Sequence, residues 1–367
     1  MTSAHGPEML DRLAARVARF SDLHGPSGEE DAVVGALLDD LRRYDLSGEV
    51  DTFGNVTARL GAYDPSKPTV AVTAHLDEVG FVVRKIESDG FLRVHRVGGT
   101  HDQVVAGQRI VLLGDDGAVP GVVGVKAKHL NTPEELSRSV GVDDAYIDVS
   151  VGSASEVRAA GIEVGTLGTF DADARRRGTR MTGKAFDDRA GVAILVELAE
   201  RLHDASLPWN VVLLATVQEE FSVRGGVSAA RRIDPDLILC IDVAIAHDTP
   251  DLREHGDTRL GAGPVLTRFT RAMLNGIVPH PKLRRFAASV AEERGIDLQH
   301  AVLQGGLTDA SNMQHVGRGA PALDVSFPTR YTHTPVETID LADLAGLTDW
   351  IEAMLTSLDR LPNLRRG

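Results

Sequence analysis

The chain of 367 residues lacks the features that define several classes of protein. It has one cysteine, Cys240, so it forms no internal disulfide, and this residue lies in the apolar run 237–241, which is typical of a packed strand. No apolar run approaches the ~18 residues that a membrane helix requires, and Glu8 and Asp11 interrupt the first twenty residues. We therefore expect a cytoplasmic protein with no membrane partner.

Basic charge is also scarce. The chain has 39 Lys and Arg against 53 Asp and Glu, a net charge of −14, and its longest basic cluster is Arg175 to Arg177. This balance disfavours binding to phosphate backbones, so we expect no nucleic-acid partner. With 43% hydrophobic and 25% charged residues the composition is typical of a globular protein, and the length predicts two structural units.

The hydrophobic pattern predicts how these two units are arranged. Two amphipathic helices are expected in residues 10–41, where Ser27 and Glu30 have the spacing of a capping box. A strand at residues 69–73, a helix at 187–202 and strands at 210–217 and 237–241 are typical of a mainly parallel sheet with helices on its faces. Short strands separated by glycine turns predict a compact β-domain between them. We therefore expect an α/β domain of residues 1–79 and 170–367, with residues 80–169 inserted into it.

Acidic and histidine side chains recur where the apolar strands end or a helix begins. In an open α/β sheet, ligands bind beyond the carboxyl ends of the strands, so residues distant in sequence can converge there. Taken singly, each candidate also has a simpler interpretation: a surface histidine, a helix-capping aspartate, a turn aspartate or a pair of solvated glutamates. Together they predict one site, formed by His75, Asp77, Asp187, Glu219, Glu220, Asp242 and His333.

The types of these side chains indicate the chemistry. Imidazoles and carboxylates without a thiolate pair suit Zn, Co or Mn, and they exclude a cysteine-based structural zinc site. Two such ions ~3.5 to 4 Å apart can activate water and stabilise an oxyanion, so hydrolysis is the natural use. A free glutamate beside them can act as general base and move the proton to the leaving amine.

Three other enzyme classes are disfavoured by their motifs. Residues 178–184 have the spacing of a P-loop, but residue 185 is Ala and no apolar strand precedes the loop. The sequence has neither the G-x-S-x-G of a serine hydrolase nor the H-E-x-x-H of a thermolysin-like protease. An NTPase and both of these hydrolase types are therefore set aside.

Six motifs, in order along the chain, resemble the co-catalytic dinuclear aminopeptidases that include the glutamyl aminopeptidases and the tetrahedral, or TET, peptidases. They are AHLDEVGF, KAFDDRAGV, QEEFSVRGG, CIDV, GGLTDA and FPTRYTHTPVE. The inserted segment is similar as well, through GGTHDQVVAGQRIVL, GVVGVKAKHL and AYIDVSVGSASEV. The resemblance implies a phosphorylase/hydrolase-like α/β fold, with a mixed, mainly parallel sheet sandwiched by helices and a small inserted β-barrel.

The resemblance also implies a set of metal ligands. Asp187 would bridge two divalent metal ions, with His75 and Asp242 on one ion and Glu220 and His333 on the other. Zn is the ion that we expect, with Co or Mn as alternatives.

Further roles follow from the same resemblance. Glu219 would be the general base, and Asp77 would lie behind His75. Four residues would lie near the substrate by their motif positions, although turn chemistry after Gly305 and Gly306 explains the first two equally well: Thr308, Asp309, Arg330 and Tyr331.

We therefore expect a metal-dependent aminopeptidase that removes N-terminal residues from short peptides, using a two-metal-activated water and a glutamate base. Members of this family commonly assemble as hollow twelve-subunit tetrahedra, which implies a homo-oligomer and in particular a dodecamer. Two alternatives stay open: a related amidohydrolase of the acylase or carboxypeptidase type, and a non-catalytic assembly protein that retains the fold. A free ammonium on the substrate distinguishes an aminopeptidase from an acylase, which accepts a blocked amine.

Overall fold

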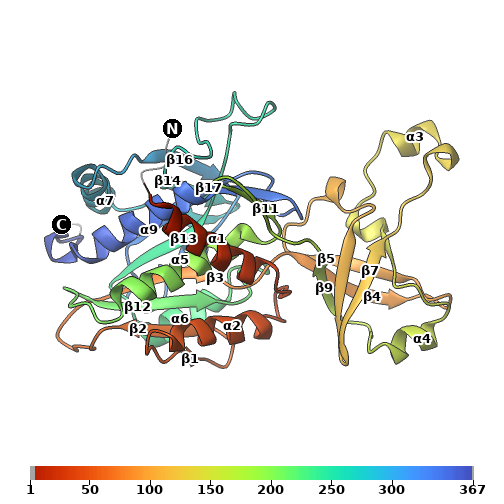
Figure 1. The fold of residues 1–367 in the computed structure, drawn as a ribbon, viewed down its shortest axis with the longest axis horizontal. Coiled ribbons are helices and arrows are strands. Elements are labelled where there is room, and N and C mark those ends of the chain that lie inside the picture. The colour runs from red at the N-terminus through yellow and green to blue at the C-terminus, as the bar shows by residue number, and fades with distance from the viewer. Residues whose placement is uncertain (1–4, 366–367) are drawn as a thin grey trace.

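The computed structural model describes residues 5–365, which form a large α/β unit and a smaller barrel beside it (Figure 1). A nine-stranded sheet runs through the α/β unit in the order β1-β2-β12-β3-β13-β17-β14-β15, with β16 paired to β14. The strands are β1 (Glu49–Val50), β2 (Val56–Leu60), β3 (Thr69–His75), β12 (Asn210–Thr216), β13 (Leu237–Ile245), β14 (Val265–Ala272), β15 (Asn275–Ile277), β16 (Gln299–Gln304) and β17 (Ala322–Thr329). The predicted mixed α/β sheet is confirmed.

The centre of this sheet is parallel, and its strands are buried on both faces. Strands β12, β3, β13 and β17 are paired in parallel, and every residue of β3 and β12 is buried. Cys240 lies buried in β13. The register pairs His75, the last residue of β3, with Thr216, the last residue of β12. The carboxyl ends of the central strands therefore meet at one edge of the sheet.

Helices cover both faces of the sheet. The larger group consists of α1 (Pro7–Ser21), α2 (Asp31–Arg42), α5 (Phe186–Leu202), α7 (Pro281–Glu293) and α9 (Leu341–Leu355). In this group α5 packs against α1, α9, β3 and β13 (Figure 1), and the buried indole of Trp350 donates a hydrogen bond to the Ala287 carbonyl at 2.9 Å. On the other face, the short helices α6 (Gly225–Ile233) and α8 (Asp309–Met313) pack on each other and on the sheet. The first residues of α5 thus lie beside the end of β3.

The predicted capping box at Ser27 and Glu30 is wrong. Helix α2 begins at Asp31 without a side-chain cap. The Ser27 hydroxyl instead donates to Asp77 Oδ2 at 2.5 Å, and Glu30 accepts from the backbone N–H of Gln218 at 3.1 Å. Glu30 also accepts from the nearby Gly28 N–H at 2.8 Å, but the reciprocal bonds of a capping box are absent between Ser27 and Glu30, and each side chain has a partner from a distant segment.

A small antiparallel sheet leads into α5. It consists of β10 (Arg175–Arg177), β11 (Arg180–Gly183) and β18 (Glu337–Asp340). The P-loop-like residues 178–184 form the turn between β10 and β11, strand β11 itself and Lys184, which is buried against Glu78. The pairing of Gly183 with Glu337 brings the segment before α5 next to the segment after β17.

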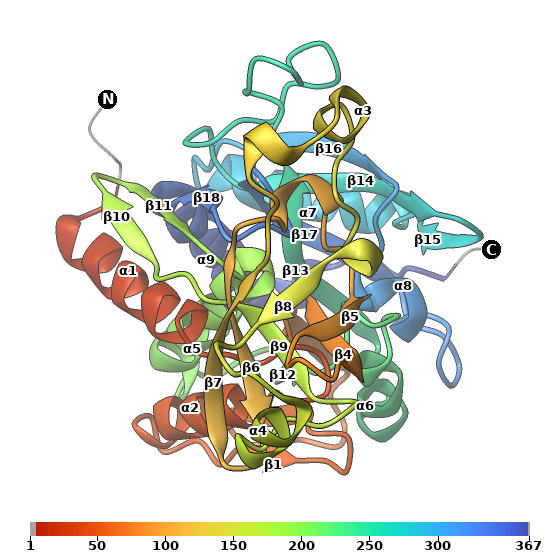
Figure 2. The same ribbon diagram turned by 90° about the vertical axis from the view of Figure 1, so that its right-hand side faces the viewer.

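The inserted part of the chain forms a closed antiparallel barrel with its own core. Its strands follow the order β4 (Gly80–Ile86), β5 (Leu92–Val97), β8 (Tyr146–Asp148), β7 (Gly117–Val123), β6 (Arg109–Gly114) and β9 (Leu167–Phe170). The rings of Phe81 and Phe170 meet edge to face inside it, with centroids 5.3 Å apart. Figure 2 shows the barrel facing the viewer, with the short helices α3 (Pro133–Leu136) and α4 (Ala154–Ala159) at its periphery. The predicted β-barrel is confirmed, and the exact domain boundaries at residues 80 and 169 stay a prediction.

No helix within residues 5–365 combines the length and apolar character needed to cross a membrane.

Candidate metal centre

Ionisable side chains gather at the carboxyl edge of the parallel strands. His75 ends β3, Asp242 lies near the end of β13, and Asp187 lies in the first turn of α5. Strand β12 ends at Thr216, and the turn after it carries Glu219 and Glu220. With His333 from the loop after β17, these side chains lie at or directly beneath a cavity of about 560 Å³. We call its charged part the acidic wall: Asp187, Glu219, Glu220, Asp242 and His333.

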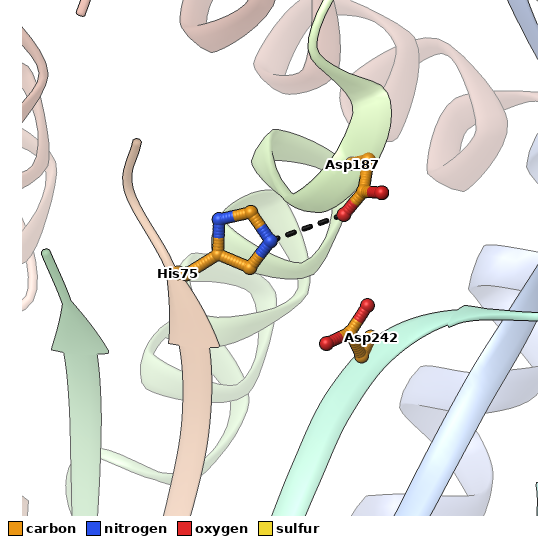
Figure 3. A group of neighbouring side chains, drawn as sticks. All are labelled: His75, Asp187 and Asp242. Atoms are coloured by element: carbon orange, nitrogen blue, oxygen red, sulfur yellow. Dashed lines mark hydrogen bonds and ion pairs between the residues drawn. The ribbon is translucent and has the colours of Figure 1, made fainter. Parts of the chain in front are cut away.

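The first group of possible ligands is His75, Asp187 and Asp242 (Figure 3). His75 Nε2 lies 3.0 Å from Asp187 Oδ1, and the ligand atoms of all three residues lie within 4.8 Å of one another. All three side chains are buried. One imidazole and two carboxylates at this separation suit an oxygen- and nitrogen-preferring divalent ion.

The second group shares Asp187 with the first. His333 Nε2 lies 3.4 Å from Asp187 Oδ2 and 3.1 Å from Glu220 Oε1, and these three ligand atoms also lie within 4.8 Å of one another. The two carboxylate oxygens of Asp187 therefore face different histidines. A carboxylate placed in this way can bridge two ions.

Both histidine rings are oriented as metal ligands usually are. His75 Nδ1 lies 3.1 Å from the Asp77 carbonyl, and His333 Nδ1 lies 3.3 Å from the Gly99 carbonyl. With its proton on Nδ1, each ring donates to a carbonyl and leaves Nε2 unprotonated. Each Nε2 points at the carboxylates.

The electrostatics of the site also fit bound cations. Burial and the Asp187 charge raise the pKa of Asp242 well above its ordinary value. Burial, with the charge of Asp242, does the same to the pKa of Glu219. Burial opposes protonation of His75, but hydrogen bonds to Asp187 and Asp77 raise its pKa well above the usual range. Among the cavity-lining residues that the structure describes there is no Lys or Arg, so negative charge is in excess.

The start of α5 bears on the simpler interpretation of Asp187 as a helix cap. The residue before the helix is Ala185, in a left-handed conformation with φ of 54°, and it makes no side-chain cap. Asp187 and Asp188 have non-helical backbone angles, and the peptide bond between them is cis. The Asp187 carboxylate is directed at the two histidines rather than at the amides of its own helix.

Glu337 holds two parts of the site together, and sequence analysis did not single it out. Its Oε2 accepts from the Asp187 N–H at 3.0 Å, and its Oε1 accepts from the His333 N–H at 2.7 Å. Burial, with the charge of Asp187, raises its pKa to about 8. Its only signal in the sequence is its place four residues after His333, in the motif FPTRYTHTPVE.

Asp77 binds the backbone of Glu219 and Glu220, as Glu337 binds the backbone of Asp187 and His333. Its Oδ1 accepts from the Glu219 N–H at 2.9 Å, and its Oδ2 accepts from the Glu220 N–H at 3.0 Å and from Ser27. Its Oδ1 also lies 3.5 Å from His75 Nδ1. Ser27 was missed as a site residue, because its spacing to Glu30 had suggested a helix cap.

A buried ion cluster lies next to the site and was also missed. Lys184 Nζ donates to both carboxylate oxygens of Glu78 at 2.8 Å, and Arg189 Nη2 lies 3.5 Å from Glu78 Oε1. Thr169, in β9 of the barrel, donates to Glu78 Oε2 at 2.9 Å. The cluster joins the end of β3 and the start of α5 to the barrel. Charged residues inside the motifs AHLDEVGF and KAFDDRAGV were its only sequence signal.

The four expected substrate residues do not lie on the cavity wall. Thr308 donates to Asp324 Oδ1 at 2.9 Å, and the buried Asp309 accepts from Thr216. Arg330 is bound to Asp248 by two hydrogen bonds of 2.6 and 2.7 Å, and Tyr331 is 52% exposed. The described lining includes their neighbours Leu307 and Thr332 instead. A role in substrate binding stays a prediction for the four.

Comparison with known proteins gives a match over most of the chain. The model of the M42 glutamyl aminopeptidase family matches residues 54–349. SgcX of Escherichia coli (strain K12) is 38% identical over 90% of this chain and 89% of its own length. The lysyl aminopeptidase of Pyrococcus furiosus is 33% identical over 91% of this chain and 94% of its own.

Solved structures show the same likeness in three dimensions. An aminopeptidase from the archaeon Desulfurococcus kamchatkensis superposes with a TM-score of 0.90 at 34% identity, covering 98% of this chain and 99% of that one. The TET1 peptidase of Pyrococcus horikoshii superposes with a TM-score of 0.83 at 29% identity, covering 95% of this chain and 99% of that one. These likenesses extend over both the sheet and the barrel.

Proposed function

The chain belongs to the M42 glutamyl aminopeptidase family, and we propose that its acidic wall uses two divalent metal ions to remove N-terminal residues from short peptides. It is a metal-dependent aminopeptidase, a hydrolase that acts on peptide bonds. The observation that carries the two-ion proposal is the position of Asp187, whose two oxygens face His75 and His333 separately.

Membership of the family implies divalent metal ions, and the residues fit them. His75 and Asp242 would hold one ion and Glu220 and His333 the other, with Asp187 between them. We propose Zn, with Co or Mn as alternatives, because all three suit imidazole and carboxylate ligands. When bound, such ions supply a Lewis acid that activates water and polarises the carbonyl of the scissile bond.

Glu219 is the proposed general base. Within residues 5–365 its carboxylate accepts no hydrogen bond, although it lies on the cavity wall beside the ligands. A carboxylate in this position can take a proton from the attacking water and then deliver it to the leaving amine. Asp77 fixes the backbone of Glu219 and Glu220 by accepting both N–H groups.

The lining of the cavity and the family match support an aminopeptidase over the related hydrolases. A carboxypeptidase must bind the free carboxylate of its substrate, yet the described cavity wall has no Lys or Arg to pair with it. An acylase differs from an aminopeptidase in accepting a blocked amine, and the family match favours the aminopeptidase.

A homo-oligomer is proposed as well. The P. horikoshii peptidase can assemble into a tetrahedron or a large octahedral shell. By analogy we propose that this chain forms a dodecamer, for which light scattering would give twelve times the 39.3 kDa of the chain.

The function is tested with chelator-stripped protein refilled with Zn, Co or Mn. We expect the refilled protein to hydrolyse leucyl-p-nitroanilide and a leucyl peptide, and the stripped protein to hydrolyse neither. N-acetyl-leucyl-p-nitroanilide is the matched control and should not be cleaved. Equal cleavage of the acetylated compound would indicate an acylase, and no cleavage with any of the ions would contradict the proposed function.

A further inference from the structure

We propose that the cavity selects peptides whose N-terminal side chain is neutral and aliphatic, and that Leu303 is a specificity-determining residue. This inference rests on the proposed function, because it concerns the same cavity. It goes beyond the two side-chain preferences named for the relatives, glutamyl and lysyl. The part of the cavity that carries it is the apolar wall: Val223, Val243, Ile245, Ala272, Leu303 and Leu307.

The sheet delivers most of this wall next to the acidic wall. Val243 and Ile245 follow Asp242 at the end of β13, so a substrate held at the acidic residues reaches apolar side chains within a few residues of strand. Strands β14 and β16 run in parallel, with Thr270 paired to Leu303. Their carboxyl ends therefore bring Ala272 and Leu303 to the same cavity.

Leu303 is held toward the cavity by its surroundings. Strand β16 alternates between half-buried and exposed residues, and Val302, on the opposite face, is 64% exposed. The loop after the strand packs closely on Leu303, since a Cβ at Gly306 would lie 3.2 Å from its side chain. The apolar wall is therefore formed in the structure, and Leu303 is part of it.

An acidic side chain would find no partner here. No Lys or Arg occurs among the described lining residues, and the nearby Arg330 is already bound to Asp248. A glutamate side chain would be desolvated on the apolar wall without a Lys or Arg to pair with it, near the carboxylate of Glu219, which is not a proposed metal ligand.

A basic side chain is also disfavoured in this part of the cavity. Every carboxylate on the described cavity wall belongs to the proposed ligand set or is the proposed base. The other side chains able to accept a hydrogen bond carry no negative charge: His101, Ser222, Gln304 and Thr332. A lysine ammonium would lose its hydration without a carboxylate of its own. A neutral aliphatic side chain meets no such penalty, and each methylene buried favours binding about fourfold.

The test uses substrates whose first side chains are similar in size and differ mainly in charge. We would measure kcat/KM of the metal-loaded protein on aminoacyl-p-nitroanilides of leucine, norleucine, lysine, glutamine and glutamate. Norleucine should exceed lysine, and leucine should exceed glutamate, each by at least about tenfold, with glutamine also above glutamate. A ratio below tenfold in either of the first two comparisons overturns the inference. Hydrolysis of no member of the panel would instead overturn the proposed function, and this inference with it.

A matched pair of variants tests the role of Leu303. Leu303→Lys places a cation on the apolar wall and should lower the leucine-to-glutamate ratio of kcat/KM at least tenfold, with metal content unchanged. Val302→Lys places the same charge on the opposite face of β16 and should leave the ratio within twofold. An unchanged ratio in Leu303→Lys overturns the assignment. If that variant does not fold, Leu303→Ala replaces it. An unchanged ratio of kcat/KM for leucine over alanine substrates in this variant would also overturn the assignment.

Discussion

The acidic and apolar walls of the cavity are held in place by different means. On the acidic wall, the backbone that carries the ionisable groups is bound by buried carboxylates: Asp77 accepts from Glu219 and Glu220, and Glu337 accepts from Asp187 and His333. On the apolar wall, side chains such as Ile245 and Leu303 are placed by strand register and packing alone. Hydrogen bonds join the residues of the acidic wall into a network, whereas the side chains of the apolar wall are positioned separately.

Because of this difference, the residues proposed for metal chemistry and those proposed for side-chain specificity can respond differently to substitution. Changes on the acidic wall remove a partner from a buried group, so they are expected to be costly and to spread to neighbours. Changes on the apolar wall alter contact area and charge locally. The proposed metal chemistry should therefore be sensitive to substitution, while the choice of side chain should be adjustable one residue at a time.

The largest expected effect on the acidic wall comes from Asp187→Ala. Because Asp187 belongs to both ligand groups, its loss should strip both ions and abolish peptide hydrolysis. Metal analysis by mass spectrometry on the purified variant checks this. Asp173→Ala, an exposed aspartate, is the control and should keep full metal content. Two retained ions in Asp187→Ala would exclude the bridging role.

The next largest effect separates two neighbouring glutamates. Glu219→Gln should keep both ions yet reduce turnover by about 10²- to 10⁴-fold, because the proton carrier is lost and no ligand is removed. Glu220→Gln should instead weaken metal binding, since Glu220 Oε1 belongs to the second ligand group. Turnover and metal content measured on both variants distinguish the roles. Equal behaviour of the two would contradict the assignment.

A smaller effect is expected from Glu337→Gln, which tests the network behind the wall. The amide nitrogen of glutamine would face one of the two backbone N–H groups that Glu337 now accepts, so Asp187 or His333 should shift. We expect metal affinity to fall about 10- to 100-fold, as measured by competition with a chelator. Val336→Ala, at an exposed neighbouring residue, should bind metal normally. Normal affinity in both variants would mean that the network does not position the ligands.

The smallest effect concerns stability and pH. Burial raises the pKa of Glu30 from its ordinary value near 4.5 to about 7, even though it accepts from the N–H of Gln218 next to the glutamate pair. The stability that protonated Glu30 contributes is present below pH 4.5 and is lost as the pH rises to about 7, by no more than about 3 kcal/mol. Thermal unfolding of the metal-free protein at pH 5 and pH 8 should therefore differ less in Glu30→Gln than in the unchanged chain. An equal difference in both would contradict the pKa shift.

Much of the fold follows from the sequence because the main elements have strong local signals. The apolar runs of β3, β12 and β13 and the periodic residues of α5 predict a parallel sheet with helices, and glycine turns predict the β-rich insertion. The order of the barrel strands has no such signal. Strand β8, for example, is three residues long, and its pairing with β5 and β7 depends on closure of the whole barrel.

The site was predictable where a polar residue ends an apolar strand, as with His75 and Asp242. It was not predictable where the partner lies far along the chain. Ser27 binds Asp77 across 50 residues, and Glu337 binds Asp187 across 150. The apolar wall was missed for another reason. The sequence does not indicate whether an apolar residue such as Leu303 faces a core or a cavity.

The central claim is that Asp187 lies between two divalent ions, and anomalous diffraction from zinc-loaded crystals tests it most directly. We expect two anomalous peaks per chain, ~3.5 to 4 Å apart, with one beside His75 and Asp242 and the other beside Glu220 and His333. A single peak, or peaks remote from Asp187, would contradict the claim.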